Sequence, residues 1–445
     1  MTTTLIDHGR VSELLDLEKQ RFVAARPRTA ELVARARTVM PNGVPMIWHA
    51  LDNDPPVYVA QGSGMRFTDL DGHEYVDFNV ADMSMFCGYG PAPIVRAVAE
   101  RMAQGPQFLL PSADAVDVAT DLARRWPVPK WQFTLSASQA NVEAIRLARV
   151  ATGRDKVLWF DGKYHGHFDD ALVRLDDGHV VNEQEGLPSH NPDRSKVIAW
   201  NDAEGLARAL EPGDVAIVLT EPALTNNVGL LLPADGWHDQ LREITRATGT
   251  LLAFDETHTL VTGPGGLVHH WGLDPDIVTA GKSIAGGVPM GAYGMTEELA
   301  DLYDPSRHDL ATGGTLFGNP LQMAAAKAAL TEILTDDAYD RTATLGAKLA
   351  DGLEAAVHEA GLDWTIHRLW ARSGTTFGPR MPSDAEDSRS MADLELSRLF
   401  RRWFANRGVW EAIVGAGPTV GVPCTEEDVT RYVAAYRELL TALLN

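Results

Sequence analysis

Two short apolar segments, each leading to a charged residue, constrain the fold of this chain more than any other feature. Leu251–Phe254 is followed by Asp255, and Asp276–Thr279 comes shortly before Lys282. Short apolar runs bounded by glycine and proline are typical of buried strands in an α/β sheet. Side chains at the carboxyl ends of such strands face the crevice in which ligands bind. We therefore expect Asp255 and Lys282 to face one pocket.

The surroundings of Lys282 in the sequence favour a chemical role over a solvated surface charge. A glycine-rich turn follows it, and its neighbours are small or apolar. Such surroundings remove water from a charged amine and favour the neutral form. Only a neutral amine attacks a carbonyl carbon, so this setting suits a lysine that forms a Schiff base. The alternative is that Lys282 is a solvated surface charge, as most lysines are.

Helical and strand-like segments alternate through the middle of the chain. The patterns predict helices over 94–102, 115–125 and 139–150, and strands over 156–160, 196–200, 215–220, 251–254 and 276–279. Alternation of this kind indicates a mostly parallel sheet with helices on both faces. The polar, turn-rich stretch 177–194 is expected to be a surface loop.

The two ends of the chain predict a smaller α+β lobe. Helical spacing over 11–40 is divided by Pro27 into two helices, and a small antiparallel meander is expected over 57–78. Later helices are expected over 322–334, 345–360, 394–407 and 426–443, with a loop at 379–389. We therefore divide the chain into 1–78 (N-terminal helices and meander, part of the small lobe), 79–320 (large, cofactor-binding domain) and 321–445 (C-terminal small α+β domain).

Composition excludes several classes of function. The 39 Lys+Arg against 61 Asp+Glu give a net charge of -22, which repels nucleic acid and anionic lipid. Cys87 and Cys424 are too few for a disulfide framework, and no His or Cys spacing predicts a metal site. The sequence shows neither a signal peptide nor a run able to span a bilayer. We expect a soluble, cytoplasmic protein.

The residues around the two charged positions also carry a family resemblance. Asp255-Glu256, Asp276-Ile277 and Gly281-Lys282-x-x-Ala285-Gly286-Gly287-x-Pro289 resemble the signature of class III aminotransferases, a group that includes glutamate-1-semialdehyde aminomutase. These are fold-type I enzymes that use pyridoxal 5'-phosphate. The resemblance implies an α/β fold with a mostly parallel central sheet, helices on both faces and a smaller α+β domain. It implies that Lys282 holds the cofactor and moves the proton, while Asp255 keeps the pyridine nitrogen protonated.

Other segments match the family's cofactor site. Ser136-Ala137-Ser138-Gln139 stands where the family usually has Ser-Gly-Thr-Glu, at the start of a predicted helix. Such a start is often only a cap, but its free N–H groups also suit a phosphate. Glu221, which closes the run 215–220, matches the family's glutamate beside the cofactor.

One aromatic and one small side chain are expected on the two faces of the cofactor ring. Tyr164 lies in a segment resembling F-x-G-x-Y-H-G and is expected to stack on the face opposite Thr257. His165 is expected either to hydrogen-bond near the ring or to order the loop. Gly314-Thr315-x-x-x-Asn319-Pro320 resembles the family's G-T-x-x-x-N-P, whose threonine reaches the phosphate of the neighbouring subunit. This implies a homodimer with active sites shared across the interface.

The substrate side departs from the family. Some members have an arginine seven residues after the cofactor aspartate, where this chain has Thr262. Core packing explains each of Met46, Trp48, Met85 and Tyr89 equally well when they are taken singly. Together they suggest an apolar pocket for an aryl or alkyl group.

Two alternatives compete with an aminotransferase. Gly281-Lys282-Ser283 resembles the end of a nucleotide-binding P-loop, but the first glycine of that motif is replaced by Asp276. The predicted reaction moves an amino group between an amine or (aryl) amino acid and a keto acid or ketone, through a Lys282 Schiff base and pyridoxamine phosphate. The runner-up is a 2,1-aminomutase of the glutamate-1-semialdehyde type, which uses the same machinery on one retained substrate.

Overall fold

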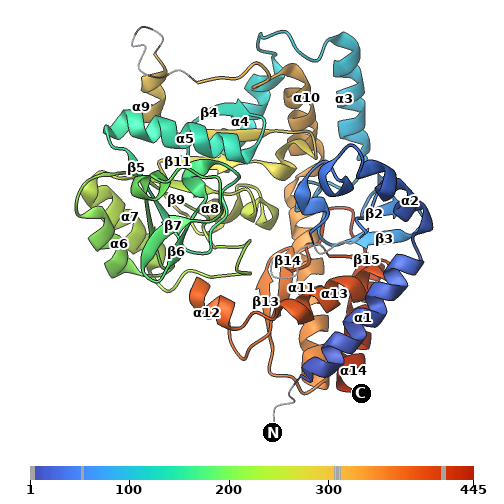
Figure 1. Cartoon of the computed structure of the whole chain (residues 1–445). Coiled ribbons are helices and arrows are strands. Elements are labelled where there is room, and N and C mark those ends of the chain that lie inside the picture. Colours follow the sequence, from blue (N-terminus) through green and yellow to red (C-terminus); the bar gives the residue numbers. More distant parts are fainter. Residues whose placement is uncertain (1–5, 52–54, 305, 307–309, 311, 412–416) are drawn as a thin grey trace.

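The computed structural model describes residues 6–51, 55–304, 306, 310, 312–411 and 417–445. Figure 1 shows a large lobe, drawn from cyan to yellow, beside a smaller lobe built from both ends of the chain. Among the described residues, no helix combines the length and apolar character that a membrane span requires.

The large lobe is organised around a mixed sheet of seven strands in the order β4-β12-β11-β10-β9-β5-β8. Only β12 runs antiparallel to its neighbours within this sheet, which confirms the mostly parallel sheet expected from the sequence. The strands are β4 (Lys130–Thr134), β5 (Lys156–Phe160), β8 (Ser195–Ile198), β9 (Val215–Thr220), β10 (Leu251–Asp255), β11 (Ile277–Ala280) and β12 (Gly291–Met295).

Two of these strands, β4 and β12, were not predicted. The sequence of β12 is Gly-Ala-Tyr-Gly-Met, and glycine normally weakens a strand. A Cβ on Gly294 would lie 2.6 Å from the ring of Trp131 on β4. The glycine is therefore there because the indole lies against the backbone of β12, a contact that the sequence pattern does not reveal.

Helices cover both faces of the sheet because successive side chains of each strand point to opposite sides. On β5, Val157 and Trp159 pack in a cluster with α5, whereas Leu158 and Phe160 pack with Trp200 and with helices on the other face. The helices of the large lobe are α3 (Ala92–Gln104), α4 (Asp114–Arg125), α5 (Ala137–Thr152), α6 (Ala203–Leu210), α7 (Trp237–Thr248), α8 (Gly266–His270), α9 (Glu297–Ala300) and α10 (Pro320–Ala328).

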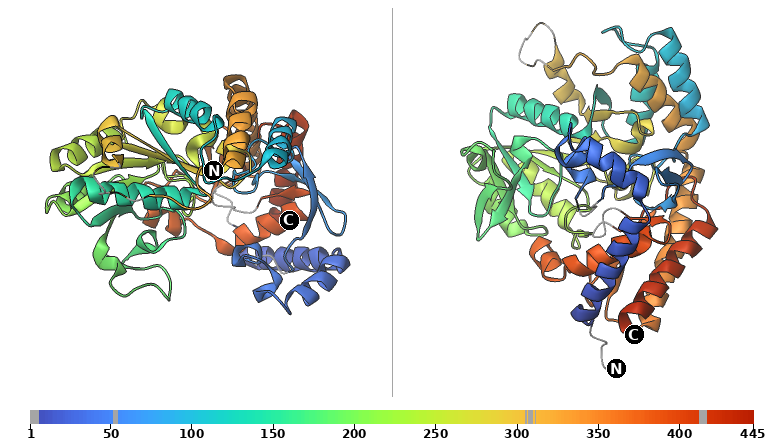
Figure 2. Two further views of the ribbon diagram at one scale, coloured as in Figure 1. Left: turned by 90° about the horizontal axis from the view of Figure 1, so that it is seen from above. Right: turned by 45° about the vertical axis from the view of Figure 1, so that its right-hand side comes forward.

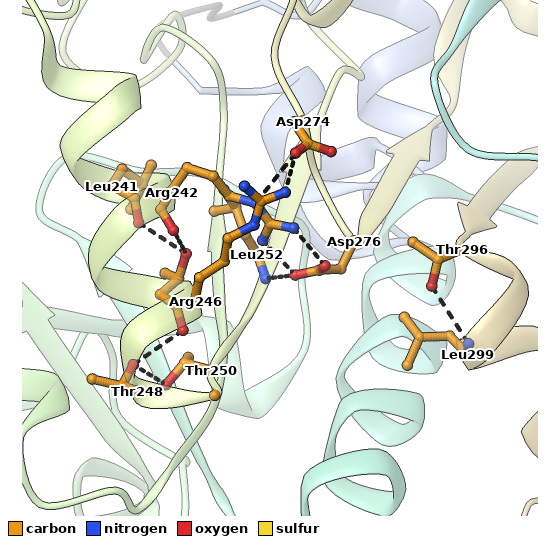
Figure 3. A network of polar contacts seen from close by, with 12 residues as sticks. Leu241, Arg242, Arg246, Thr248, Thr250, Leu252, Asp274, Asp276, Thr296 and Leu299 are labelled. Atoms are coloured by element: carbon orange, nitrogen blue, oxygen red, sulfur yellow. Dashed lines mark hydrogen bonds and ion pairs between the residues drawn. The ribbon is translucent and has the colours of Figure 1, made fainter.

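A partly buried ion pair fixes the two strands that end at the candidate site. Arg242 on α7 donates two hydrogen bonds of 2.8 Å to the carboxylate of Asp276, just before β11. Asp276 also accepts a 2.8 Å bond from the backbone N–H of Leu252 on β10 (Figure 3). This network sets the position of β11 relative to β10, and the two strands consequently deliver Asp255 and Lys282 to the same edge of the sheet.

The smaller lobe joins the two ends of the chain in one sheet. The order β1-β2-β3-β15 places β15 parallel to β3, with Val409 beside Val76. Helix α1 packs against α13 and α14, as both views in Figure 2 show. The elements are α1 (His8–Ala24), α2 (Pro27–Ala36), β1 (Val59–Ser63), β2 (Arg66–Asp69), β3 (Glu74–Asp77), α11 (Asp336–Glu359), β13 (Thr365–Leu369), β14 (Arg372–Thr376), α13 (Leu394–Ala405), β15 (Val409–Trp410) and α14 (Glu426–Leu444).

Three local expectations were wrong. The stretch expected to be a loop at 177–194 begins inside a hairpin of β6 (Val173–Asp176) and β7 (His179–Asn182), because Asp177 and Gly178 both adopt the positive φ of a tight hairpin turn. Within 379–389 a short helix, α12 (Ala385–Ser390), begins after Asp384, whose side chain accepts from the backbone of Asp387. The single helix expected over 322–334 is α10 followed by a π-helical turn, Ala329–Ile333.

Candidate active site

One cavity lies at the ends of the central strands and brings together most of the candidate residues. Its volume is about 260 Å³. Of the residues expected to contact the cofactor, all except Glu221 and Thr315 line this cavity. The rest of its wall includes Asp82, Ser84 and His258, which the sequence analysis did not single out.

Asp255, the last residue of β10, presents a carboxylate held by three donors. Oδ2 accepts from Asn141 Nδ2 at 2.8 Å and lies 2.9 Å from His165 Nδ1, and Oδ1 accepts from the backbone N–H of Thr257 at 3.0 Å. Burial alone would raise the pKa of Asp255, but its hydrogen bonds, first among them the one from His165, outweigh burial, and the pKa lies below its ordinary value. The cavity therefore has an ionised carboxylate in its wall.

His165 supports Asp255 as a neutral imidazole. The ring is buried and stacks on Trp159 with centroids 5.6 Å apart. Burial lowers the pKa of His165 in spite of the nearby Asp255. Because a carboxylate only accepts hydrogen bonds, Nδ1 carries the proton and donates it toward Asp255. Of the two roles expected for this residue, the geometry gives His165 a direct contact with the carboxylate.

Helix α5 points its N-terminus into the cavity. Ser136 caps the helix, and its Oγ accepts from the backbone N–H of Gln139 at 3.3 Å. Free N–H groups and the positive end of the helix dipole attract an anion at such a position. Gly166 closes this corner: its φ is +113°, and a Cβ there would lie 2.1 Å from Ser138 Oγ. Only glycine fits this approach without displacing the loop.

The remaining walls suit a flat, polar ring. Tyr164 and Thr257 both line the cavity, and the Thr257 hydroxyl is buried without a partner among the described residues. Burial raises the pKa of Tyr164 to about 12, so its phenol stays neutral. A carboxylate, an anion-binding helix start and a primary amine around one cavity are the donor set that pyridoxal 5'-phosphate requires, and the residues present fit it.

Lys282 lies in a turn directly after β11 with φ +51°, an unusual backbone conformation for a residue with a side chain. Its Nζ is 2.8 Å from His258 Nε2 and forms an ion pair with Asp82. Glycines and apolar residues flank Lys282 in the sequence, but the fold brings a carboxylate and an imidazole to its amine.

His258 is a neutral partner of this amine. The ring is buried, and Asn226 Nδ2 lies 3.1 Å from the same Nε2 atom. Burial, followed by the charge of Lys282, lowers the pKa of His258 well below its ordinary value. A neutral imidazole accepts a hydrogen bond at Nε2 from the ammonium form of Lys282.

Several candidates lie away from the cavity. Glu221 is buried behind the wall, where it accepts bonds from the backbone and hydroxyl of Thr225 at 3.2 and 2.5 Å. Thr315 is exposed, and its carbonyl accepts from Gln107. The structure thus separates these two residues from the cavity within a single chain.

The four side chains expected to form an apolar pocket are not brought together. Met46 is exposed. Tyr89 donates a 2.6 Å bond to Asp77 and packs on Phe67 in the small lobe. Trp48 and Met85 each lie beside a residue of the cavity wall: the Trp48 ring is 5.8 Å from that of Tyr164, and Met85 lies against Gly287.

Asp82 and His258 were missed for different reasons. Asp82 is the one acid in the segment 82–89, whose other residues include Met and Phe and predict apolar packing. His258 follows Thr257 directly, so its position beside a strand end was a usable signal. Among the described residues, no three His, Cys, Asp or Glu side chains are grouped as a metal site requires.

Comparisons with known proteins agree with this geometry. The family model described as Aminotransferase class-III matches residues 49–420. A relative named glutamate-1-semialdehyde 2,1-aminomutase, from Akkermansia muciniphila, is 33% identical over 94% of this chain and 99% of its own length.

Solved structures lead to the same family. A glutamate-1-semialdehyde aminomutase from Pseudomonas aeruginosa is 34% identical with a TM-score of 0.93, covering 98% of this chain and 99% of its own. An omega-transaminase from Sphaerobacter thermophilus is 31% identical with a TM-score of 0.87, covering 94% and 98%. The chain belongs to the class III aminotransferases, fold-type I enzymes whose cofactor is pyridoxal 5'-phosphate.

Proposed function

We propose that this enzyme moves an amino group between an amine or amino acid and a keto acid or ketone, with the cofactor held in the cavity at the ends of β10 and β11. The observation that carries the proposal is that the Lys282 amine and the ionised Asp255 carboxylate face the same cavity, beside the N-terminus of α5. When bound, the cofactor supplies an aldehyde carbon that condenses with amines and a pyridine ring that accepts electrons.

The residues of the wall take separate roles in binding. The backbone N–H groups at Ser136–Ser138 hold the phosphate, with the helix dipole adding to the attraction. Asp255 keeps a proton on the pyridine nitrogen, and His165 and Asn141 keep Asp255 ionised and oriented. Tyr164 and Thr257, which both line the cavity, would contact the faces of the ring.

Lys282 first binds the cofactor and then acts as the base. With the cofactor bound, Nζ would act as the base that takes up and gives back the proton of the substrate carbon, and the cofactor would supply the electron-accepting ring. Asp82 and His258 stabilise the protonated amine between these two transfers, because each presents an acceptor to Nζ. Both groups therefore help to hold the transferred proton at Nζ.

We also propose that the active enzyme is a homodimer. Thr315 lies on the surface of the single chain, away from the cavity that would hold the phosphate. In a dimer with shared sites, this hydroxyl reaches the phosphate of the neighbouring subunit. The exposed position of Thr315 supports this arrangement.

A 2,1-aminomutase is the second candidate. It is favoured by the names of the similar proteins from A. muciniphila and P. aeruginosa, whereas the omega-transaminase from S. thermophilus favours transfer between two substrates. Both reactions use the same lysine and the same ring.

A half-reaction screen distinguishes the two candidates. Simple amines, amino acids and diamino or amino-aldehyde acids are added singly to the loaded enzyme, and the cofactor absorbance is followed. A transaminase responds to a broad set of simple donors and releases a carbonyl product. Response only to diamino or amino-aldehyde acids would favour the aminomutase, and no response to any donor would reject both.

A further inference from the structure

We propose that Thr279 is a positioning residue for the cofactor: its hydroxyl fixes the amide of Asn141, and that amide in turn directs the carboxylate of Asp255 toward the pyridine nitrogen. The inference rests on the proposed function, in which Asp255 is the partner of that nitrogen. It adds a residue outside the cavity wall, because neither Thr279 nor Asn141 lines the cavity. Thr279 is the one polar residue of strand β11, Ile277–Ala280.

The register of the central sheet places Thr279 beside Asp255. Their Cα atoms are partners in the parallel pair of β10 and β11, so the two side chains point to the same face of the sheet. Helix α5 covers this face, where Ala144 packs in one cluster with Ile277, two residues before Thr279 on the same strand. Thr279 and Asp255 therefore both face the helix that carries Asn141.

The amide of Asn141 is hydrogen-bonded at both ends. Oδ1 accepts from Thr279 Oγ1 at 2.6 Å, and Nδ2 donates to Asp255 Oδ2 and to the carbonyl of His165, both at 2.8 Å. Each of the two N–H groups of Nδ2 thus has one acceptor. Asn141 and Thr279 are both 0% exposed, so water does not compete for these bonds.

The orientation of the Asn141 amide decides whether Asp255 receives a donor. The two ends of an amide are similar in shape, so its partners set the orientation. With the amide reversed, Oδ1 would meet Asp255 Oδ2 and the His165 carbonyl, and acceptors would face one another. The Thr279 hydroxyl satisfies Oδ1 in the observed orientation and strengthens the N–H donors at the other end by polarisation. Without this hydroxyl a buried oxygen has no donor, and the amide can turn away from Asp255.

The donors on Asp255 determine what is left for the ring. A carboxylate offers about four lone-pair sites. Asn141 and His165 occupy those of Oδ2, and the backbone N–H of Thr257 occupies one of Oδ1. The remaining site is on Oδ1, and a charge-assisted bond from the pyridine nitrogen depends on its direction. The chain from Thr279 through Asn141 keeps the carboxylate from rotating and so holds this site in place.

The experiment compares pyridoxal 5'-phosphate with its 1-deaza analogue, in which a C–H group replaces the ring nitrogen. Both compounds are titrated into the cofactor-free protein, and calorimetry gives the dissociation constants. In the wild type we expect the natural cofactor to bind about tenfold or more tightly than the analogue. This preference should fall about fivefold in Thr279→Val, which keeps the shape and removes the hydroxyl, and should return in Thr279→Ser.

The preference separates a positioning role from a structural one. A variant that only loosens the fold weakens the binding of both compounds equally, and an unchanged preference in Thr279→Val would overturn the inference. Thr220→Val is the matched control, because Thr220 is also 0% exposed, in the neighbouring strand β9, and its hydroxyl donates to the carbonyl of Glu221 at 2.9 Å. Thr220→Val should keep the wild-type preference. An equal fall in both variants would also overturn the inference.

A second measurement tests the route through Asn141. In Asn141→Ala the amide is gone, and adding Thr279→Val should lower the preference no further. A further fivefold fall would show that Thr279 acts by another route and would reject the inference. A wild-type protein without any preference would reject the contact between Asp255 and the ring nitrogen, and the inference with it. A wild-type preference that survives in Thr279→Val would reject the inference alone.

Discussion

The imidazole of His165 lies 2.9 Å from the carboxylate of Asp255; His165 follows β5, and Asp255 is the last residue of β10. Because the ring donates to Oδ2 and Asn141 donates to the same atom, the carboxylate is fixed in direction and kept ionised. This pair makes the role of Asp255 testable by a substitution that keeps its shape and removes its charge.

Asp255→Asn should lower turnover by about 100-fold or more while the protein stays folded. An amide cannot keep a proton on the pyridine nitrogen, so the ring loses its strength as an electron acceptor. Stopped-flow measurement of the half-reaction reports the loss, and circular dichroism checks the fold. Turnover near the wild-type rate would show that Asp255 is not the partner of the ring.

Lys282→Ala should abolish turnover, and borohydride should fix the cofactor to a wild-type peptide that contains Lys282. Lys163 is the internal control, because it is also buried but donates to the carbonyl of Ala171 at 2.5 Å and that of Val173 at 2.7 Å. Peptide mapping by mass spectrometry identifies the labelled residue. Label on Lys163, or on any lysine other than Lys282, contradicts the assignment.

Glu221→Gln should stabilise the cofactor-free protein at alkaline pH. Burial, aided by the charge of Asp255 and opposed by the bonds from Thr225, raises the pKa of Glu221 to about 8. The unfolded chain releases this proton near pH 4.5, whereas the folded chain keeps it until about pH 8. Wild-type stability therefore declines as the pH rises through this window, by a few kcal/mol, roughly 1.4 kcal/mol for each pH unit.

Glutamine does not titrate, so the comparison isolates this proton. The Tm of Glu221→Gln should match the wild type near pH 5 and exceed it by several degrees near pH 8.5. Differential scanning calorimetry across the window measures the difference. An equal offset at both pH values would mean that Glu221 does not retain its proton.

Gly166→Ala should weaken cofactor binding by about tenfold or more, because the added Cβ would meet Ser138 at the start of α5. Gly178→Ala is the matched control. It has a φ of +74° in the turn between β6 and β7, and a Cβ there meets nothing within 4 Å. Both variants bear the cost of a left-handed alanine, and only the first crowds the helix start. If titrations show similar losses of cofactor affinity in Gly166→Ala and Gly178→Ala, the start of α5 beside Gly166 does not bind the phosphate.

Thr315→Ala should weaken cofactor retention at the site of the neighbouring subunit. The sharper test mixes Lys282→Ala and Thr315→Ala subunits. In a mixed dimer, the site with an intact Lys282 also receives an intact Thr315 from its partner, so activity should return at about half a wild-type dimer's value. Mixtures whose activity does not exceed that expected from the two separate variants would exclude sites shared across the interface.

The sequence predicted the parts of the site that depend on local pattern. Strands β5 and β9 lie at the predicted residues, and Asp255 and Lys282 were identifiable because strand ends in a parallel sheet meet at one edge. Strand β12 was not predicted, because Gly294 makes room for the ring of Trp131, and this contact exists only in the folded structure. Local pattern therefore located the central strands but not every one of them.

The polar groups around Lys282 needed the tertiary structure. Asp82 lies between β3 and α3 and depends on a left-handed turn at residues that are not glycine, which no propensity predicts. His258 is adjacent in sequence to a predicted residue, but its contact with Nζ depends on how the chain turns after β10. The side chains of Met46, Trp48, Met85 and Tyr89 are all bulky and largely apolar, but the fold does not bring them together in one pocket.

The pairing of β15 with β3 has a consequence for how the enzyme matures. Strand β3 leaves the ribosome early, but its outer edge has no partner until Val409 and Trp410 have been synthesised. The turn that carries Asp82 begins directly after β3, so this part of the catalytic wall is completed only late in translation. A nascent chain therefore exposes an unpaired strand edge for most of its synthesis, and protection of that edge by a chaperone would raise the yield of active enzyme.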